Sequence, residues 1–308
     1  MLIQRSLFPD AFEIEEQALA KLDRFELEDA LRLVADARAR DPGLDLEWLR
    51  VALLWLRREL GGERVSDELL ALLFLTVPEA CLRGELTAEA AARLDEVIAR
   101  QGLARAEARA FLDPEGRVHR GALLLVLRRN AEAHALLREA VAADDGRADL
   151  WGGFAEASYT LERLDEANAA YVRALLLAAG EVDLLRLRHP RLLALQRELA
   201  ALHGEACARE LLLVHAWLAG VLTIPPENGW LDAHLSRLHL LAAVRATSPP
   251  EQRLRRFTLL FYRDRSQATG RYDEAEREEM QALDPELFER VLKHIQAREQ
   301  VQTRALCW

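Results

Sequence analysis

Apolar residues recur at helical spacing along most of the chain, and residues 149–177 show the pattern most clearly. In the first half of this segment, one helical face would carry Trp151, Phe154, Ala155 and Ser158. After the polar residues 161–163, a second such face would carry Leu164, Ala167, Tyr171 and Ala174. Residues on one side of a helix recur at this spacing. The pattern therefore predicts two antiparallel helices joined by a short turn.

This segment resembles the tetratricopeptide repeat (TPR), a helix-turn-helix unit of about 34 residues. The residues that match the family pattern are Trp151, Ala155, Leu164, Ala167, Tyr171 and Ala174. The glycine and proline that the family usually carries are replaced by Glu162 and Ala179. The match is good but incomplete.

The same spacing of matching residues, called the repeat frame below, recurs in neighbouring segments. A unit starting at Pro114 carries matching residues at Gly121, Leu124, Ala133, Leu137 and Ala140, and it leads into Ala148 without an insertion. A unit starting at Ala11 carries them at Ala18, Ala30, Val34, Ala37 and Pro42. The next unit, starting at Asp45, holds the frame only at Trp48, Ala52 and Trp55. Because stacked units bury one another's faces, recurrence in register favours a repeat over an isolated helix pair.

The chain beyond residue 180 is predicted to be helical without a clear repeat. Pattern and proline positions predict helices over 190–203, 205–222, 230–245 and 251–267, with a last helix from Pro285. A further TPR-like unit is expected at 256–285, where Gly270, Ala275 and Ala282 match. We therefore divide the chain into a TPR-like region, 1–180, and a further helical region, 181–308.

The resulting fold prediction is all-α, a right-handed superhelical array of antiparallel helix pairs, or α-solenoid. Composition agrees, because 15 glycines and 10 prolines in 308 residues are few for a turn-rich β protein. The net charge of −10 disfavours nucleic acid as a partner. The longest nearly apolar stretch, 211–224, is shorter than a membrane span, and we expect no membrane insertion. Three scattered cysteines and the absence of a signal-peptide pattern favour the cytoplasm, and we expect a bacterial source.

Candidate chemistry is sparse. The sequence holds no Walker P-loop, dinucleotide-binding glycine motif, zinc-protease motif or serine-hydrolase elbow, which favours a non-catalytic protein without a cofactor or metal. His234 and His239 are five residues apart and so would not share a helical face. A folded cluster of these two with Cys207, His215 and Asp232 is the weaker alternative. The basic cluster Arg253, Arg255 and Arg256 beside Phe257 is interpreted as a salt-bridged helix surface.

The resemblance also implies a binding groove, because TPR arrays line a concave surface with first-helix residues. In the unit starting at Ala148 these residues are Asp149, Gly152, Glu156, Tyr159 and Thr160. In the preceding unit they are Glu115, Val118, Ala122, Leu125 and Val126. Such a surface would suit a basic or amphipathic peptide. It would equally suit the protein's own C-terminal helices, and the sequence leaves both possibilities open.

The function expected from these patterns is a protein–protein interaction scaffold or adaptor that binds a peptide or helix of a partner protein. One alternative is a helical enzyme, or a ligand- or metal-binding protein, with its site in region 181–247. Another is a structural homodimer joined through Leu287, Val291 and Ile295 of the last helix. Fold alone does not decide among these classes.

Overall fold

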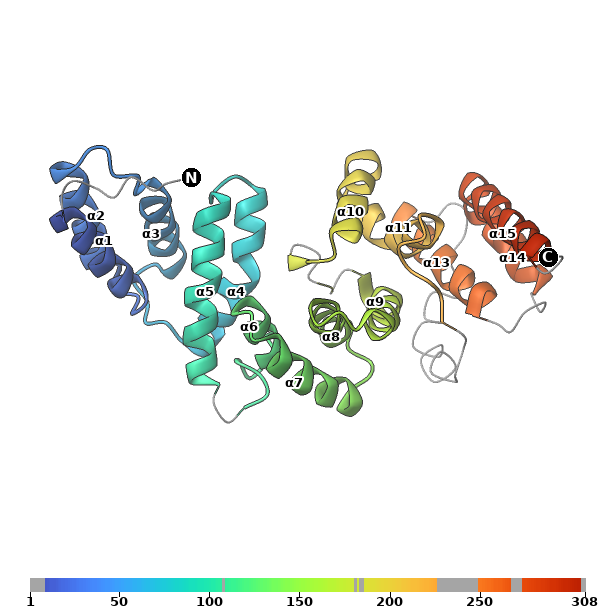
Figure 1. Ribbon diagram of the computed structural model, residues 1–308, viewed down its shortest axis with the longest axis horizontal. Helices are drawn as coiled ribbons and strands as arrows, with labels where there is room; N and C mark the ends of the chain where they lie inside the picture. Colours follow the sequence, from blue (N-terminus) through green and yellow to red (C-terminus); the bar gives the residue numbers. More distant parts are fainter. Residues whose placement is uncertain are drawn as a thin grey trace. The chain divides into compact units, whose positions relative to one another are not determined.

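A computed structural model describes residues 9–106, 109–179, 182, 186–225, 249–266 and 273–305. Within these residues every named element is a helix, as the sequence predicts (Figure 1). Neighbouring helices along the chain pack against each other in pairs. The chain divides into two compact units, Met1–Leu136 and Leu137–Trp308. No described helix combines the length and the apolar character that crossing a membrane requires.

Unit 1 contains six helices among the described residues and the start of a seventh. They are α1 (Pro9–Leu22), α2 (Leu27–Arg40), α3 (Glu47–Leu60), α4 (Asp67–Leu82), α5 (Ala88–Arg105), α6 (Arg120–Val126) and α7 (Asn130–Ala143), which crosses the unit boundary. Contacts join α1 to α2, α2 to α3, α4 to α5 and α5 to α6. The predicted frame breaks after α3, where Gly61 and Gly62 both have positive φ and lengthen the turn.

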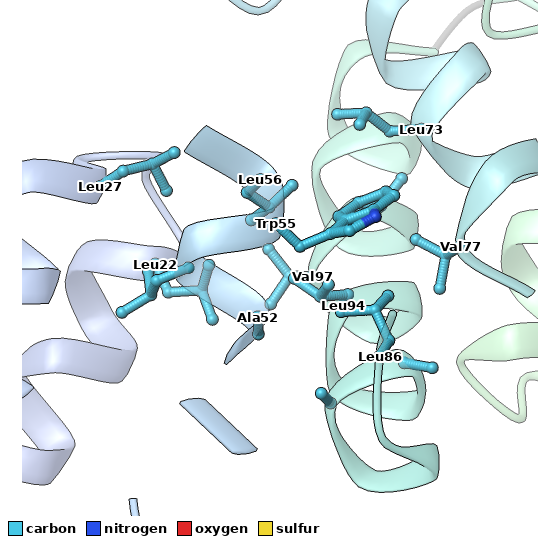
Figure 2. Close-up of a cluster of buried hydrophobic side chains, with 14 of the residues drawn as sticks. Leu22, Leu27, Ala52, Trp55, Leu56, Leu73, Val77, Leu86, Leu94 and Val97 are labelled. Atoms are coloured by element: carbon cyan, nitrogen blue, oxygen red, sulfur yellow. The ribbon is translucent and has the colours of Figure 1, made fainter. Parts of the chain in front are cut away.

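The core of unit 1 includes Trp55, which is only 4% exposed. Its ring extends from α3 towards Leu73 and Val77 of α4 and Leu94 and Val97 of α5 (Figure 2). Small residues such as Ala18, Ala30 and Ala52 are fully buried where helices approach. These are places where the repeat frame predicts small side chains.

Unit 2 contains the second set of helices. They are the rest of α7, then α8 (Ala148–Thr160), α9 (Leu164–Ala178), α10 (Pro190–His203), α11 (Glu205–Leu218), α13 (Pro250–Ser266), α14 (Glu274–Leu283) and α15 (Pro285–Ala305). Packed pairs are α8 with α9, α10 with α11, α11 with α13, α13 with α14 and α14 with α15. The predicted helix 230–245 and Gly270 lie outside the described residues.

Three inter-helix turns share one backbone geometry. Phe25, Arg128 and Glu162 have φ of 56°, 59° and 60° and are the described non-glycine residues with positive φ. Each stands at the same place in its predicted unit, and in the last unit this is where the TPR family usually has glycine. A left-handed residue just after a helix closes the Schellman motif, which satisfies the last free carbonyls of that helix. The three turns therefore end their helices with the same backbone conformation.

The first helix of the unit starting at Pro114 is shorter than its frame predicts. The Asp113 carboxylate accepts hydrogen bonds from the backbone N–H of Arg117 at 3.0 Å and of Val118 at 3.2 Å. This turn passes through Gly116 at φ 69°, and α6 begins only at Arg120. His119 caps it by accepting from the N–H of Gly121 at 3.0 Å. The expected helix over residues 115–119 is therefore a loop.

Helix α15 is part of the packed core of unit 2. Leu287, Val291 and Ile295 are buried within the chain, so a dimer through these residues would first require α15 to leave its own unit. The His294 ring lies 4.6 Å from that of Trp217 on α11. Helix α15 is therefore held to unit 2 by buried side chains.

Candidate functional site

The first-helix face of α8 carries five of the predicted groove residues. Asp149 begins this face and pairs with Arg147, whose Nε and Nη2 lie 3.0 and 2.5 Å from its carboxylate oxygens. Tyr159 and Thr160 end it, and both are half-buried. Gly152 and Glu156, in the middle, are buried. The α8 face, as these five residues are called below, is thus half-buried at its ends and buried at its centre.

Glu156 is the polar centre of the α8 face, with only 7% of its surface exposed. One carboxylate oxygen accepts a hydrogen bond from the Tyr171 hydroxyl of α9. The other accepts from the backbone N–H of Arg188 at 2.8 Å. Burial, and then the negative charge of Glu156, raise the pKa of Tyr171 above its usual range, so its hydroxyl stays a donor. The carboxylate therefore holds a backbone amide of the segment that follows α9.

Gly152 provides the space for a second contact with that segment. A Cβ added at this position would lie 3.1 Å from Cγ1 and 3.8 Å from Cβ of Val182. Val182 is itself buried. A side chain larger than hydrogen at residue 152 would therefore push Val182 away from α8.

Tyr159 makes the third contact through its ring. Its centroid lies 4.5 Å from that of His189, with the planes tilted by 31°, while Tyr171 meets the edge of the same imidazole at 5.8 Å. The His189 Nδ1 also accepts from the N–H of Leu192 at 3.3 Å, which caps α10. Burial lowers the pKa of His189, which favours the neutral ring in this aromatic contact.

Val182, Arg188 and His189 are called the covering residues below. They come from the connection between α9 and α10, and not from the C-terminal helices that the sequence suggested as an occupant. Sequence reasoning missed all three. The only signal was the His-Pro pair at 189 and 190, which marks the start of a helix but does not show what the preceding residues contact.

The predicted groove residues of the preceding unit lie in unit 1. Glu115 and Val118 are in the loop before α6 rather than on a helix, and Val118 is buried. Leu125 is also buried, Ala122 and Val126 are half-buried, and Glu115 is exposed. Val118 belongs to the hydrophobic core of unit 1, and Ala122 and Val126 pack against that core.

The basic cluster on α13 is held by ion pairs and buried contacts. Arg255 donates to the carbonyl oxygens of Leu175 at 3.0 Å, Leu177 at 2.8 Å and also Leu176, at the C-terminal end of α9. It also lies 3.6 Å from the Glu210 carboxylate. Arg256 forms a two-point pair with Glu279 at 2.8 and 2.9 Å, and Phe257 is fully buried. The interpretation as a salt-bridged helix surface therefore fits Arg256. It does not fit Arg255, whose side chain is only 11% exposed and binds the end of α9.

A cavity lies between α10, α11 and α15 of unit 2. This cavity has a volume of about 380 Å³ and is lined by Leu195, Glu198, Leu199, Leu202, His203, His215, Leu218, Ala219 and Arg290. His215 is half-buried at its wall. The described residues contain no group of three or more His, Cys, Asp or Glu side chains placed to hold a metal ion. Asp232, His234 and His239 lie outside the described residues.

Comparison with protein-family models, with curated proteins and with solved structures found no match for this chain.

Proposed function

We propose that this protein is a non-catalytic interaction scaffold that binds a peptide segment of a partner protein on the α8 face. The observation that carries the proposal is the α8 face together with its covering residues. The face holds a backbone amide through Glu156, an aliphatic side chain over Gly152 and a ring against Tyr159. Backbone and side-chain contacts of these kinds are what peptide recognition uses.

The proposal includes competition between the partner and the protein's own covering residues. A partner segment that supplies an N–H, an aliphatic residue and a ring would take the places of Arg188, Val182 and His189. The binding energy would then be the difference between two similar sets of contacts. Asp149, which pairs with Arg147, and Thr160 are half-buried at the ends of the face and would border the partner segment.

The finer architecture belongs to the same proposal. We infer that the helix pairs form a right-handed TPR-like array, because Arg128 and Glu162 close equivalent turns one repeat apart.

The experiment is capture of partners from a lysate of the source organism on the intact chain, followed by mass spectrometry. Tyr159→Ala removes the ring from the face and should lower partner recovery at least fivefold. Val182→Ala combined with His189→Asn weakens the cover and should raise recovery, because asparagine keeps a capping acceptor for α10. Leu164→Ala, at the exposed start of α9, is the matched control.

The two variants are expected to shift recovery in opposite directions, which general damage to the fold would not do. Equal recovery on the wild type, Tyr159→Ala and the cover variant would contradict binding at the α8 face. A circular-dichroism melt of each variant checks that it is folded before capture.

A further inference from the structure

The cavity between α10, α11 and α15 has the composition of a small-molecule site. Its walls come from three helices of one compact unit. Its volume of about 380 Å³ lies at the lower end of the range typical of ligand pockets, about 300–1,000 Å³. Such a size favours a small molecule.

One side of the cavity is apolar. Leu195, Leu199, Leu202 and Leu218 contribute aliphatic surface, and Leu202 is 76% exposed. Leaving a leucine this open to water forgoes the favourable free energy of burying its apolar surface. A ligand with an aliphatic group would recover part of that free energy.

The polar side chains of the cavity include two opposite charges. Among the described residues, Glu198 of α10 and Arg290 of α15 are exposed and form no ion pair or hydrogen bond with another protein group. Arg290 offers a planar fork of donors suited to a carboxylate. Glu198 offers acceptors suited to an ammonium group. A ligand that satisfies both must carry a negative and a positive group beside its apolar part.

His215 is the third polar group at the wall. Burial, and then the nearby charges of Arg290 and His203, lower the pKa of His215 to about 4. The imidazole is therefore neutral near pH 7 and can donate or accept one hydrogen bond without adding a charge. The formal charges of Glu198 and Arg290 at the cavity then balance.

We propose that this cavity binds a free α-amino acid with an aliphatic side chain, of which leucine is the representative. The α-carboxylate pairs with Arg290, the α-ammonium group pairs with Glu198, and the side chain packs against the leucines of α10 and α11. A simple aliphatic acid would leave Glu198 unpaired near a second negative charge. An aliphatic amine would leave Arg290 unpaired. This site is separate from the α8 face and does not depend on the proposed function.

The test is isothermal titration calorimetry of the full chain with three probes that differ by one charged group. L-leucine is expected to bind with a Kd of about 1 mM or lower. 4-Methylpentanoate, which lacks the ammonium group, and 3-methylbutylamine, which lacks the carboxylate, are each expected to bind at least tenfold more weakly.

Three variants test which protein side chain binds each charged group of leucine. Arg290→Gln and Glu198→Gln should each weaken leucine binding by about tenfold, because each removes one charged hydrogen-bond partner. Only Arg290→Gln should also weaken 4-methylpentanoate, and Arg197→Gln, elsewhere on α10, should leave leucine binding unchanged. Absence of leucine binding at about 10 mM would overturn the proposal. So would binding of 4-methylpentanoate as tight as that of leucine, or leucine binding that neither charge variant weakens.

Discussion

Arg128 and Glu162 lie 34 positions apart in the sequence and have nearly the same φ, 59° and 60°. Each donates its N–H to the carbonyl three residues earlier, Leu125 at 3.0 Å and Tyr159 at 3.0 Å. The next residue in each turn donates to the carbonyl five residues earlier, at 2.9 Å in both cases. The two turns therefore end their helices in the same way, although neither has the glycine that this conformation favours.

We expect Glu162→Gly to stabilise the protein by about 0.5–1 kcal/mol. A non-glycine residue in the left-handed region costs about 1–2 kcal/mol, partly offset by the greater freedom of glycine in the unfolded chain. Urea denaturation measures the change. Gly61→Ala is the reverse control, because Gly61 has φ 55° and an added Cβ would meet no atom within 4 Å. A loss of stability in Glu162→Gly would show that the Glu162 side chain contributes more than the backbone strain.

Tyr171→Phe should destabilise unit 2 by about 1.5–3 kcal/mol, since it removes a hydrogen bond to a buried carboxylate. Tyr159→Phe is the matched control. The Tyr159 hydroxyl forms no hydrogen bond with another described residue, so this change should leave stability nearly unaltered. Similar melting temperatures for the two variants would mean that the contact between Tyr171 and Glu156 contributes little.

Arg255→Met should lower the free energy of unfolding by about 3–5 kcal/mol. The change leaves Glu210 without its cation and removes the donor to three carbonyls at the end of α9. Burial already raises the pKa of Glu210, while Arg255 opposes that rise. Lys293→Met, which breaks an exposed pair with Glu289 at 2.7 Å, should cost at most about 0.5 kcal/mol. Chemical denaturation of both variants makes the comparison, and equal costs would contradict this role for Arg255.

Acidification should weaken unit 2 through His215. The ordinary imidazole pKa of 6.5 falls to about 4 in the folded chain, owing to burial and to Arg290 and His203, with Asp284 opposing the change. As the pH falls from about 6.5 towards 4, the unfolded chain takes up a proton that the folded chain does not, so the free energy of unfolding decreases.

Allowing for partial exposure, we expect His215 to account for a loss of about 1–2 kcal/mol between pH 7 and pH 4.5. His215→Gln should remove that part of the acid sensitivity. His203→Gln, which removes only one of the smaller causes of the lowered His215 pKa, should retain most of it. Urea denaturation at the two pH values measures the difference. An equal loss in the wild type and His215→Gln would show that other groups carry the acid response.

Helical spacing, proline positions and the repeat frame predict most of the helices. The expected helix 190–203 coincides with α10, because Pro190 fixes its start and Gly204 its end. The expected helix 205–222 ends earlier, at Leu218, because Gly220 adopts a left-handed conformation with φ 61°. The loop before α6 was not predicted, since its turn depends on hydrogen bonds from two backbone amides to the buried Asp113 carboxylate. Apolar spacing predicts helix faces but does not show that a side chain such as Asp113 will bind the backbone amides that follow it.

The candidate site was predicted only in part for the same reason. The resemblance places Gly152, Glu156 and Tyr159 on one face of α8, which the structure also does. It gives no information about which segment covers that face, because Val182 and His189 belong to a connection without periodicity. The cavity beside His215 depends on Arg290, which is distant in sequence, and no local motif links the two.

The most direct measurement of competition at the α8 face uses a reversible disulfide between Gly152→Cys and Val182→Cys, in a chain whose own cysteines are replaced by serine. An added Cβ at residue 152 would lie 3.8 Å from the Val182 Cβ, close to the separation usual in disulfides. Oxidation should hold the cover in place and abolish partner capture, and reduction should restore it. Recovery of the same partner in equal amounts from the oxidised and reduced protein would contradict binding at this face.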